Sequence, residues 1–157
     1  MTRTLAALLL FLPSFVLATD PELPTPILLS VPNPPAPFTG SDQRIYLVYE
    51  LWITNFSSGD ATIQSVEVLA DGKTLRKLDA AEIGQRLQGS RESVSVLPKS
   101  TQALLFIHVD LAPGTTIPKQ LTPRLDAHFA AAPPSHQDLT ETGGLVSIDT
   151  RPIVNIP

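Results

Sequence analysis

The chain has 157 residues, of which 43% are apolar and 17% are charged, and it contains no cysteine. This length predicts one domain that is large enough to bury a core without a metal or a disulfide bond. The lack of cysteine excludes thiolate zinc sites, iron–sulfur clusters and cysteine nucleophiles. The excess of 15 acidic over 11 basic side chains disfavours nucleic acid and anionic membranes as partners.

Residues 1–18 have the pattern of a cleavable secretory signal. Arg3 provides an early positive charge, a mostly apolar run follows, and Val16 and Ala18 occupy the −3 and −1 positions of a cleavage site. A membrane anchor is the alternative, but the apolar run is shorter than the roughly 20 residues of a spanning helix and is broken by Pro13. We expect a periplasmic or secreted bacterial protein that has no membrane contact after the signal is removed.

Residues 19–43 are predicted to form a proline-rich arm with a possible edge strand. Prolines flank the short apolar run at residues 27–31 on both sides. Such prolines fit an edge strand, because a proline cannot donate the ladder hydrogen bonds that a central strand needs. An extended polyproline arm is the alternative.

Residues 44–55 are the strongest strand candidate, because they are dense in β-branched and aromatic side chains. Alternate residues of a strand lie on opposite faces of the sheet. One face is expected to belong to the core and carries Leu47, Tyr49, Leu51 and Ile53. Since a long apolar strand at a sheet edge would promote aggregation, we expect this strand to be central in its sheet.

The other face of the same strand is apolar as well. Tyr46, Val48 and Trp52 surround a single carboxylate, Glu50, and are too apolar for an ordinary solvated face. Either a helix or a loop of the domain covers them, or they form an exposed aromatic patch that binds a partner. Tyr46, Val48 and Trp52 are therefore the candidate binding residues.

Residues 61–70 are predicted to form a strand with an irregularity. Ile63 and Val66 are both apolar but have opposite parity, so we expect a bulge or a change of sheet near Gln64 and Ser65. The polar residues that follow at 71–73 predict the tip of a hairpin.

Residues 79–87 are the one convincing helix. Asp79 suits the N-cap, and Glu82 follows it at the spacing of a capping box. Ile83 and Leu87 lie on one stripe of the helix, which is expected to face the core.

The rest of the chain is predicted to consist of strands and turns. The candidate strands are residues 93–97, 101–111, 120–130 and 145–156, with a polar loop over residues 133–144. About seven short strands with frequent turns favour an immunoglobulin-like antiparallel β-sandwich with one short helix over an α/β fold. The sandwich domain is expected to span residues 44–157.

Residues that carry chemistry are sparse. His108 and Asp110 share a strand face and His128 lies on a later strand, so these three could bind the metal of a metal-dependent hydrolase. The simpler interpretation is the half-exposed polar face of a strand. No zinc-protease helix motif, nucleophile elbow or phosphate-binding loop occurs, so we expect no catalytic residue, no metal site and no cofactor. Residues 55–57 match a glycosylation sequon, which we interpret as the start of a turn.

The run LVYELWITNF at residues 47–56, followed by SVEVL at 65–69 and by LP at 97–98 leading to LLFI at 104–107, resembles a known family. It is similar to the β-rich domain that precedes the catalytic domain in some exported lysostaphin-like zinc metallopeptidases, and the likeness covers about residues 46–156. In such proteins the β-rich domain is an accessory module, and the peptidase that follows it cleaves peptidoglycan crosslinks.

The zinc ligands of that family lie in a His-x-x-x-Asp segment and a later His-x-His segment, and this chain contains neither. The resemblance therefore implies a non-catalytic accessory module of the bacterial cell envelope and not an enzyme. It also implies a protein partner or a peptidoglycan-associated hydrolase as the binding partner. A truncated or split fragment of such a peptidase is the alternative.

Overall fold

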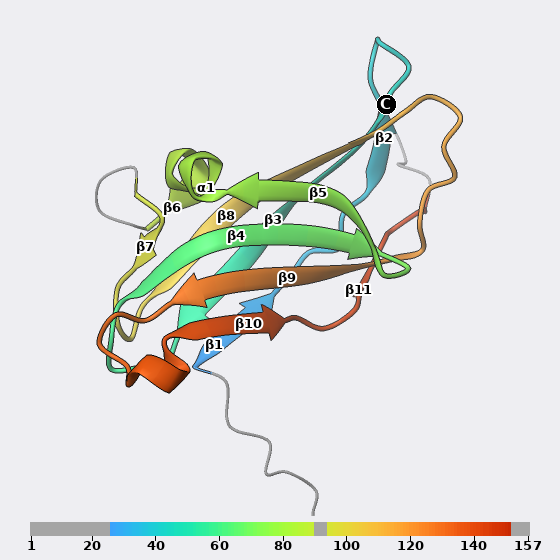
Figure 1. The fold of residues 1–157 in the computed structure, drawn as a ribbon. Helices are drawn as coiled ribbons and strands as arrows, with labels where there is room; N and C mark the ends of the chain where they lie inside the picture. Colours follow the sequence, from blue (N-terminus) through green and yellow to red (C-terminus); the bar gives the residue numbers. More distant parts are fainter. Residues whose placement is uncertain (1–25, 90–93, 152–157) are drawn as a thin grey trace, which may run out of the picture.

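The computed structural model of the protein describes residues 26–89 and 94–151, which form two antiparallel β-sheets and one short α-helix (Figure 1). The mostly β character expected from the sequence is confirmed. The predicted secretory signal at residues 1–18 lies outside the described residues, as do residues 19–25 of the proline-rich arm.

The first sheet is built around the longest strand. Its order is β1 (Ile27–Ser30), β3 (Ile45–Asn55), β8 (Gln102–Leu111) and β6 (Leu87–Gln88), with β2 (Pro37–Thr39) also paired to β3. Because β3 has neighbours on both sides, its predicted central position is confirmed. β1 is the edge strand that the flanking prolines predict and not an extended polyproline arm.

The second sheet contains the remaining strands. Its order is β10 (Asp138–Thr142), β9 (Gln120–His128), β4 (Ala61–Ala70) and β5 (Lys73–Asp79), with β11 (Val146–Ser147) paired to β9 and β7 (Val96–Leu97) paired to β4. In Figure 1, β4, β5, β9 and β10 lie in front of β3 and β8. The chain changes sheet between β3 and β4 and between β5 and β6, then at each step from β6 to β7, from β7 to β8 and from β8 to β9.

Side chains from both sheets form one apolar core. The inward face of β3 is the predicted one, because Leu47, Leu51 and Ile53 are fully buried and Tyr49 is nearly so. These odd-numbered residues face inward, so the even-numbered residues of β3 face outward. The core thus determines which side chains of β3 are left for a binding surface.

β4 contains the bulge that its sequence predicts. In its ladder with β9, Ile63 pairs with Ala127 and Ser65 pairs with Asp126, so Gln64 is an extra residue on β4. The extra residue changes the parity of the strand, and both Ile63 and a fully buried Val66 therefore belong to the core.

The turn and the helix predicted after β4 are both present. Asp71 and Gly72 have φ angles of 48° and 74°, and such a left-handed pair closes a two-residue hairpin, here between β4 and β5. The helix α1 (Ala80–Arg86) begins after Asp79, whose side chain accepts a hydrogen bond from the backbone nitrogen at the third helical position. Ile83 is fully buried, so the helix packs on the core.

The prediction of a polar loop over residues 133–144 is wrong in part, because the strand β10 lies within this range. The sequence DLTET of β10 has little apolar alternation and carries no strand signal of its own. It becomes a strand because β9 has a free edge and polar side chains match across the ladder. Asp138 lies opposite His128, and Thr140 lies opposite Asp126.

Several other boundaries differ from the prediction. β2 and β5 were not expected as strands, because prolines surround the first and charged residues fill the second. β11 is shorter than the strand predicted over residues 145–156, of which residues 152–156 lie outside the described part. Short segments such as these are strands through their neighbours and not through their own sequence pattern.

Candidate functional site

The outer face of the first sheet is apolar and exposed. The registers of β3 with β2 and β8 place six apolar side chains on this face, and we call them the aromatic face: Phe38, Tyr46, Val48, Trp52, Leu104 and Phe106. Phe38 is 48% exposed, Val48 is 47% exposed and Phe106 is 44% exposed. Tyr46 and Trp52 are half-buried. The helix α1 packs against β4, β5 and β8 and leaves Val48 exposed, so it does not cover the predicted patch.

A row of rings crosses three strands of this face. The rings of Phe38 and Tyr46 stack with their centres 5.5 Å apart, and the rings of Tyr46 and His108 lie 5.2 Å apart. Side chains of neighbouring strands stand roughly perpendicular to the sheet, so rings stacked in this way present their edges outward. Rings from β2, β3 and β8 therefore form one continuous row on the outer face of the first sheet.

Charged groups lie at one end of the aromatic face. Arg44, which lies just before β3, forms an ion pair with Asp110 of β8. The hydroxyl of Tyr46 donates a hydrogen bond to Asp42 Oδ2 at 2.5 Å. This hydrogen bond holds the pKa of the Asp42 carboxyl below its usual value and raises the pKa of Tyr46. A polar border beside an apolar centre is the usual anatomy of a protein interface.

Glu50 lies within the apolar part of the face. It is half-buried, it faces Phe106 across the ladder, and Val48 and Trp52 flank it on the same face of β3. Trp52 Nε1 donates a hydrogen bond to Glu50 Oε2 at 3.4 Å. No cation forms an ion pair with Glu50 within residues 26–89 and 94–151.

The structure does not bring the three candidate metal ligands together. His108 and Asp110 are exposed on the outer face of the first sheet. His128 lies on the second sheet, where its Nδ1 is 2.9 Å from Asp138 Oδ1. Within the described part of the chain, no group of three or more histidine and carboxylate side chains has an arrangement suited to a metal ion.

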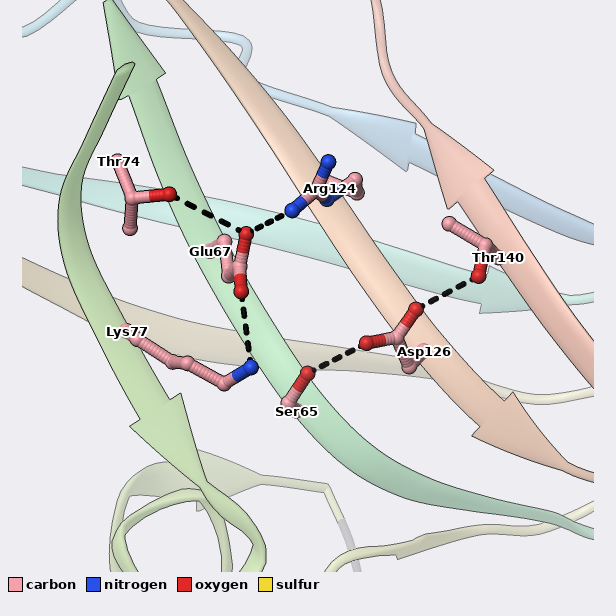
Figure 2. A network of polar contacts seen from close by, with 7 residues as sticks. All are labelled: Ser65, Glu67, Thr74, Lys77, Arg124, Asp126 and Thr140. Atoms are coloured by element: carbon pink, nitrogen blue, oxygen red, sulfur yellow. Dashed lines mark hydrogen bonds and ion pairs between the residues drawn. The ribbon is translucent and has the colours of Figure 1, made fainter. Parts of the chain in front are cut away.

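The outer face of the second sheet has the opposite character (Figure 2). Seven side chains from β4, β5, β9 and β10 form polar contacts there: Ser65, Glu67, Thr74, Lys77, Arg124, Asp126 and Thr140. Glu67 accepts from Lys77 Nζ at 2.8 Å and also pairs with Arg124. The hydrogen bond from Lys77 is the main reason why the pKa of Glu67 is lowered despite the burial of its side chain.

Asp126 is the second acceptor of that network. The hydroxyls of Ser65 and Thr140 each donate to it at 2.7 Å, and their hydrogen bonds lower its pKa. Donors and acceptors on this face therefore satisfy one another, as expected for a solvated sheet face. The asymmetry between the two outer faces makes the aromatic face the candidate site.

Asn55, the first residue of the match to a glycosylation sequon, has a structural role. Its side chain is fully buried, and its Oδ1 accepts hydrogen bonds from the backbone nitrogen of Ser57 at 2.9 Å and from Ser57 Oγ at 2.6 Å. The predicted turn at this point is thus an Asx-type turn. The amide nitrogen is engaged with buried carbonyl groups and is not accessible for modification.

The sequence identified only part of the aromatic face. The sequence could have predicted that Leu104 and Phe106 belong to this face, because they alternate with the core residues of β8. Tyr46, Val48 and Trp52 alternate with the core residues of β3 in the same way. Phe38 gave no signal, since it lies among prolines and joins the face only through the pairing of β2 with β3.

No protein-family model matches the chain, and a search of curated proteins finds no match. Among the described residues, no helix is long and apolar enough to cross a membrane.

Proposed function

We propose that the protein is an exported, non-catalytic accessory module of the bacterial cell envelope that binds a protein partner through its aromatic face. The observation that carries this proposal is the exposure of Phe38, Val48 and Phe106 on one sheet face, while the opposite face is a satisfied polar network. Tryptophan, tyrosine and phenylalanine are enriched at interfaces and often dominate the binding energy. The residues proposed to bind are Tyr46, Val48 and Trp52 together with their neighbours on the face.

We also propose that the two sheets form a β-sandwich of immunoglobulin type. The order β1-β3-β8-β6 in one sheet and β10-β9-β4-β5 in the other corresponds to the A-B-E-D and G-F-C-C′ orders of such sandwiches, which supports this topology. Sandwiches of this kind commonly serve as recognition modules, but their fold does not specify a ligand. The proposed partner is therefore argued from the aromatic face and from the sequence pattern, and not from the fold.

The partner that we propose is a peptidoglycan-associated hydrolase. The resemblance of residues 47–56 to the accessory domain of lysostaphin-like metallopeptidases supports it, as does the secretory pattern of residues 1–18. The residues of this phrase alternate between the core and the aromatic face of β3. A module without the zinc-binding motifs would contribute binding and positioning, and the hydrolase would supply the chemistry.

The test is capture by the chain purified after export. The immobilised protein is incubated with envelope extract and, separately, with purified peptidoglycan sacculi. Captured hydrolase activity is measured on a peptidoglycan gel for the wild type, for Trp52→Ala and for the control Gln64→Ala on the second sheet. We expect capture by the wild type and the control and at least about tenfold less by Trp52→Ala. The proposal fails if neither a hydrolase nor sacculi are retained, or if Trp52→Ala retains them equally.

A further inference from the structure

One edge of β8 is partly open. On one side, residues 102–111 all pair with β3. On the other side, β6 pairs only with Leu104 and Leu105, and residues 107–111 pair with no strand in the described part of the chain. Successive residues of a strand direct their backbone N–H and C=O groups to alternate sides. Every second residue of this segment therefore directs its backbone groups toward the open edge, where a further strand can bind them.

The helix α1 is the reason why this edge is open. β6 pairs Leu87 with Leu105 and Gln88 with Leu104, so a longer β6 in the same register would pair residues 81–85 with residues 107–111. Those residues are helical instead, and α1 packs mainly against β4 and β5 of the second sheet. In Figure 1, β8 continues beyond α1 toward the loop that leads to β9.

A cavity of about 590 Å³ lies at the far end of this edge, and its volume is in the range of ligand-binding pockets. Apolar side chains from β8, from β4 and β5 and from the loop after β8 line it: Leu111, Ala70, Leu75 and Ile117. The buried residues of β8 are the odd-numbered ones, so Leu111 faces inward. A residue directly opposite Leu111 on an added strand would point the same way, toward the cavity.

Two lysines make the lining of this cavity basic. Lys73 and Lys119 are exposed, and neither forms an ion pair with a described residue. Asp71 is the one acidic residue among the lining side chains. The whole chain, in contrast, has a formal net charge of -4. A local excess of positive charge on an acidic protein favours a ligand that carries a carboxylate.

We propose that an extended segment of a partner protein adds to the first sheet as a strand alongside residues 107–111 of β8. Its residue opposite Leu111 is apolar and fills the cavity against Leu75, and a carboxylate of the same segment pairs with Lys73 or Lys119. Strand addition takes its affinity from main-chain hydrogen bonds and its specificity from pockets for alternate side chains. This site goes beyond the proposed function, because it lies at the edge of the sheet and not on the aromatic face.

A phage-displayed library of random linear peptides is the probe. Peptides of about seven residues, at about 3.3 Å per residue, are long enough to span the open edge and reach the cavity. Enriched peptides are synthesised and titrated by calorimetry into the wild type, Lys73→Glu, Lys119→Glu and Lys99→Glu. The last is the matched control, because Lys99 is an exposed lysine that precedes β8 at its other end.

We expect enrichment of peptides that combine alternating apolar residues with an acidic residue. Their binding should weaken at least about fivefold in Lys73→Glu or in Lys119→Glu, and by less than about twofold in Lys99→Glu. In amide exchange followed by NMR, the bound peptide should slow exchange within residues 107–111 and leave that of β10, an edge strand of the other sheet, unchanged.

The proposal is overturned if no such peptide is enriched, if neither charge reversal at the cavity weakens binding, or if the slowed amides lie outside residues 107–111. It is also overturned if the wild type dimerises without peptide and protects residues 107–111, since a second copy would then occupy the edge. None of these outcomes affects the Trp52-dependent capture that tests the proposed function.

Discussion

The side-chain amide of Asn55, at the end of β3 in the first sheet, donates a hydrogen bond at 3.2 Å to the carbonyl oxygen of Leu97 in β7 of the second sheet. The same nitrogen lies 2.9 Å from the carbonyl oxygen of Gly59 and 3.2 Å from that of Pro98. This one side chain therefore ties together the ends of both sheets and the turn through which the chain passes from β3 to β4.

Removing this amide should be strongly destabilising. We expect Asn55→Ala to lower the free energy of unfolding by about 3 kcal/mol, because buried carbonyl groups lose their donor. Urea denaturation measures the effect. The control is Gln102→Ala, which removes an exposed amide bonded to Thr54 and should change stability by less than about 0.5 kcal/mol. Equal losses in the two variants would contradict the role of Asn55.

A pH-dependent version of this experiment uses Asn55→Asp. A carboxylate at this position would face carbonyl oxygens in a buried site, so its folded-state pKa should be raised. A raised pKa means that the folded state holds its proton more tightly, and the variant should lose more stability at pH 7 than at pH 4 relative to wild type. A loss independent of pH would show that the site has opened to water.

The hydroxyl of Tyr49 is buried without a hydrogen-bond partner among the described residues, and burial raises its pKa. We expect Tyr49→Phe to increase the free energy of unfolding by about 1 kcal/mol, because it removes an unsatisfied polar group and keeps the ring. Tyr46→Phe is the matched control, since it loses the bond to Asp42 and should be neutral or slightly destabilising. Destabilisation by Tyr49→Phe in urea titrations would indicate a hydrogen bond in solution.

The polar network of the second sheet should make stability depend on acid pH. Because the pKa of Glu67 is lowered in the folded state, the unfolded chain binds more protons near and below the ordinary value of 4.5. The stabilisation is therefore complete above that value and is lost as the pH falls through the lowered pKa. Thermal unfolding from pH 7 to pH 3 should show a shallower acid decline in Glu67→Gln, and an identical decline would contradict this assignment.

The two faces of β3 should respond differently to truncation. Leu51 is fully buried, and Leu51→Ala should cost about 3 kcal/mol through the cavity that it leaves. Trp52→Ala, on the half-buried outer face, should cost only about 1 kcal/mol although it removes a larger side chain. Calorimetry of both variants measures the loss of stability. A larger loss of stability in Trp52→Ala than in Leu51→Ala would mean that the aromatic face is part of the folded core in solution.

Amide exchange should be slowest in β3, because β8 pairs with residues 45–54, β1 and β2 pair with the two ends of the strand on its other side, and its inward side chains are buried. The amides of Tyr49 and Leu51 should therefore exchange far more slowly than those of β10 at the sheet edge. Hydrogen exchange followed by NMR measures this difference. Faster exchange in β3 than in β10 would be inconsistent with the strand order.

Local features were predictable wherever a residue's own chemistry decides its conformation. The parity of Ile63 and Val66 required a bulge, Asp79 supplied an N-cap, and the alternation in β3 separated its core residues from Tyr46 and Trp52. Three of the residues on the aromatic face were identified in the same way. These signals depend on side-chain periodicity and on capping groups, which act over a few residues.

The sequence by itself thus determined that the chain forms strands around an apolar core, and which side chains of β3 that core requires. Only the tertiary structure decided that β10 is a strand, that Phe38 joins Tyr46, and that His108 and His128 belong to different sheets. Each of these outcomes depends on which strands become neighbours, and partners are selected by the combined packing of residues distant in sequence. For this reason the sequence predicted the residues of the aromatic face on β3, but it did not predict that residues of β2 and β8 complete the face.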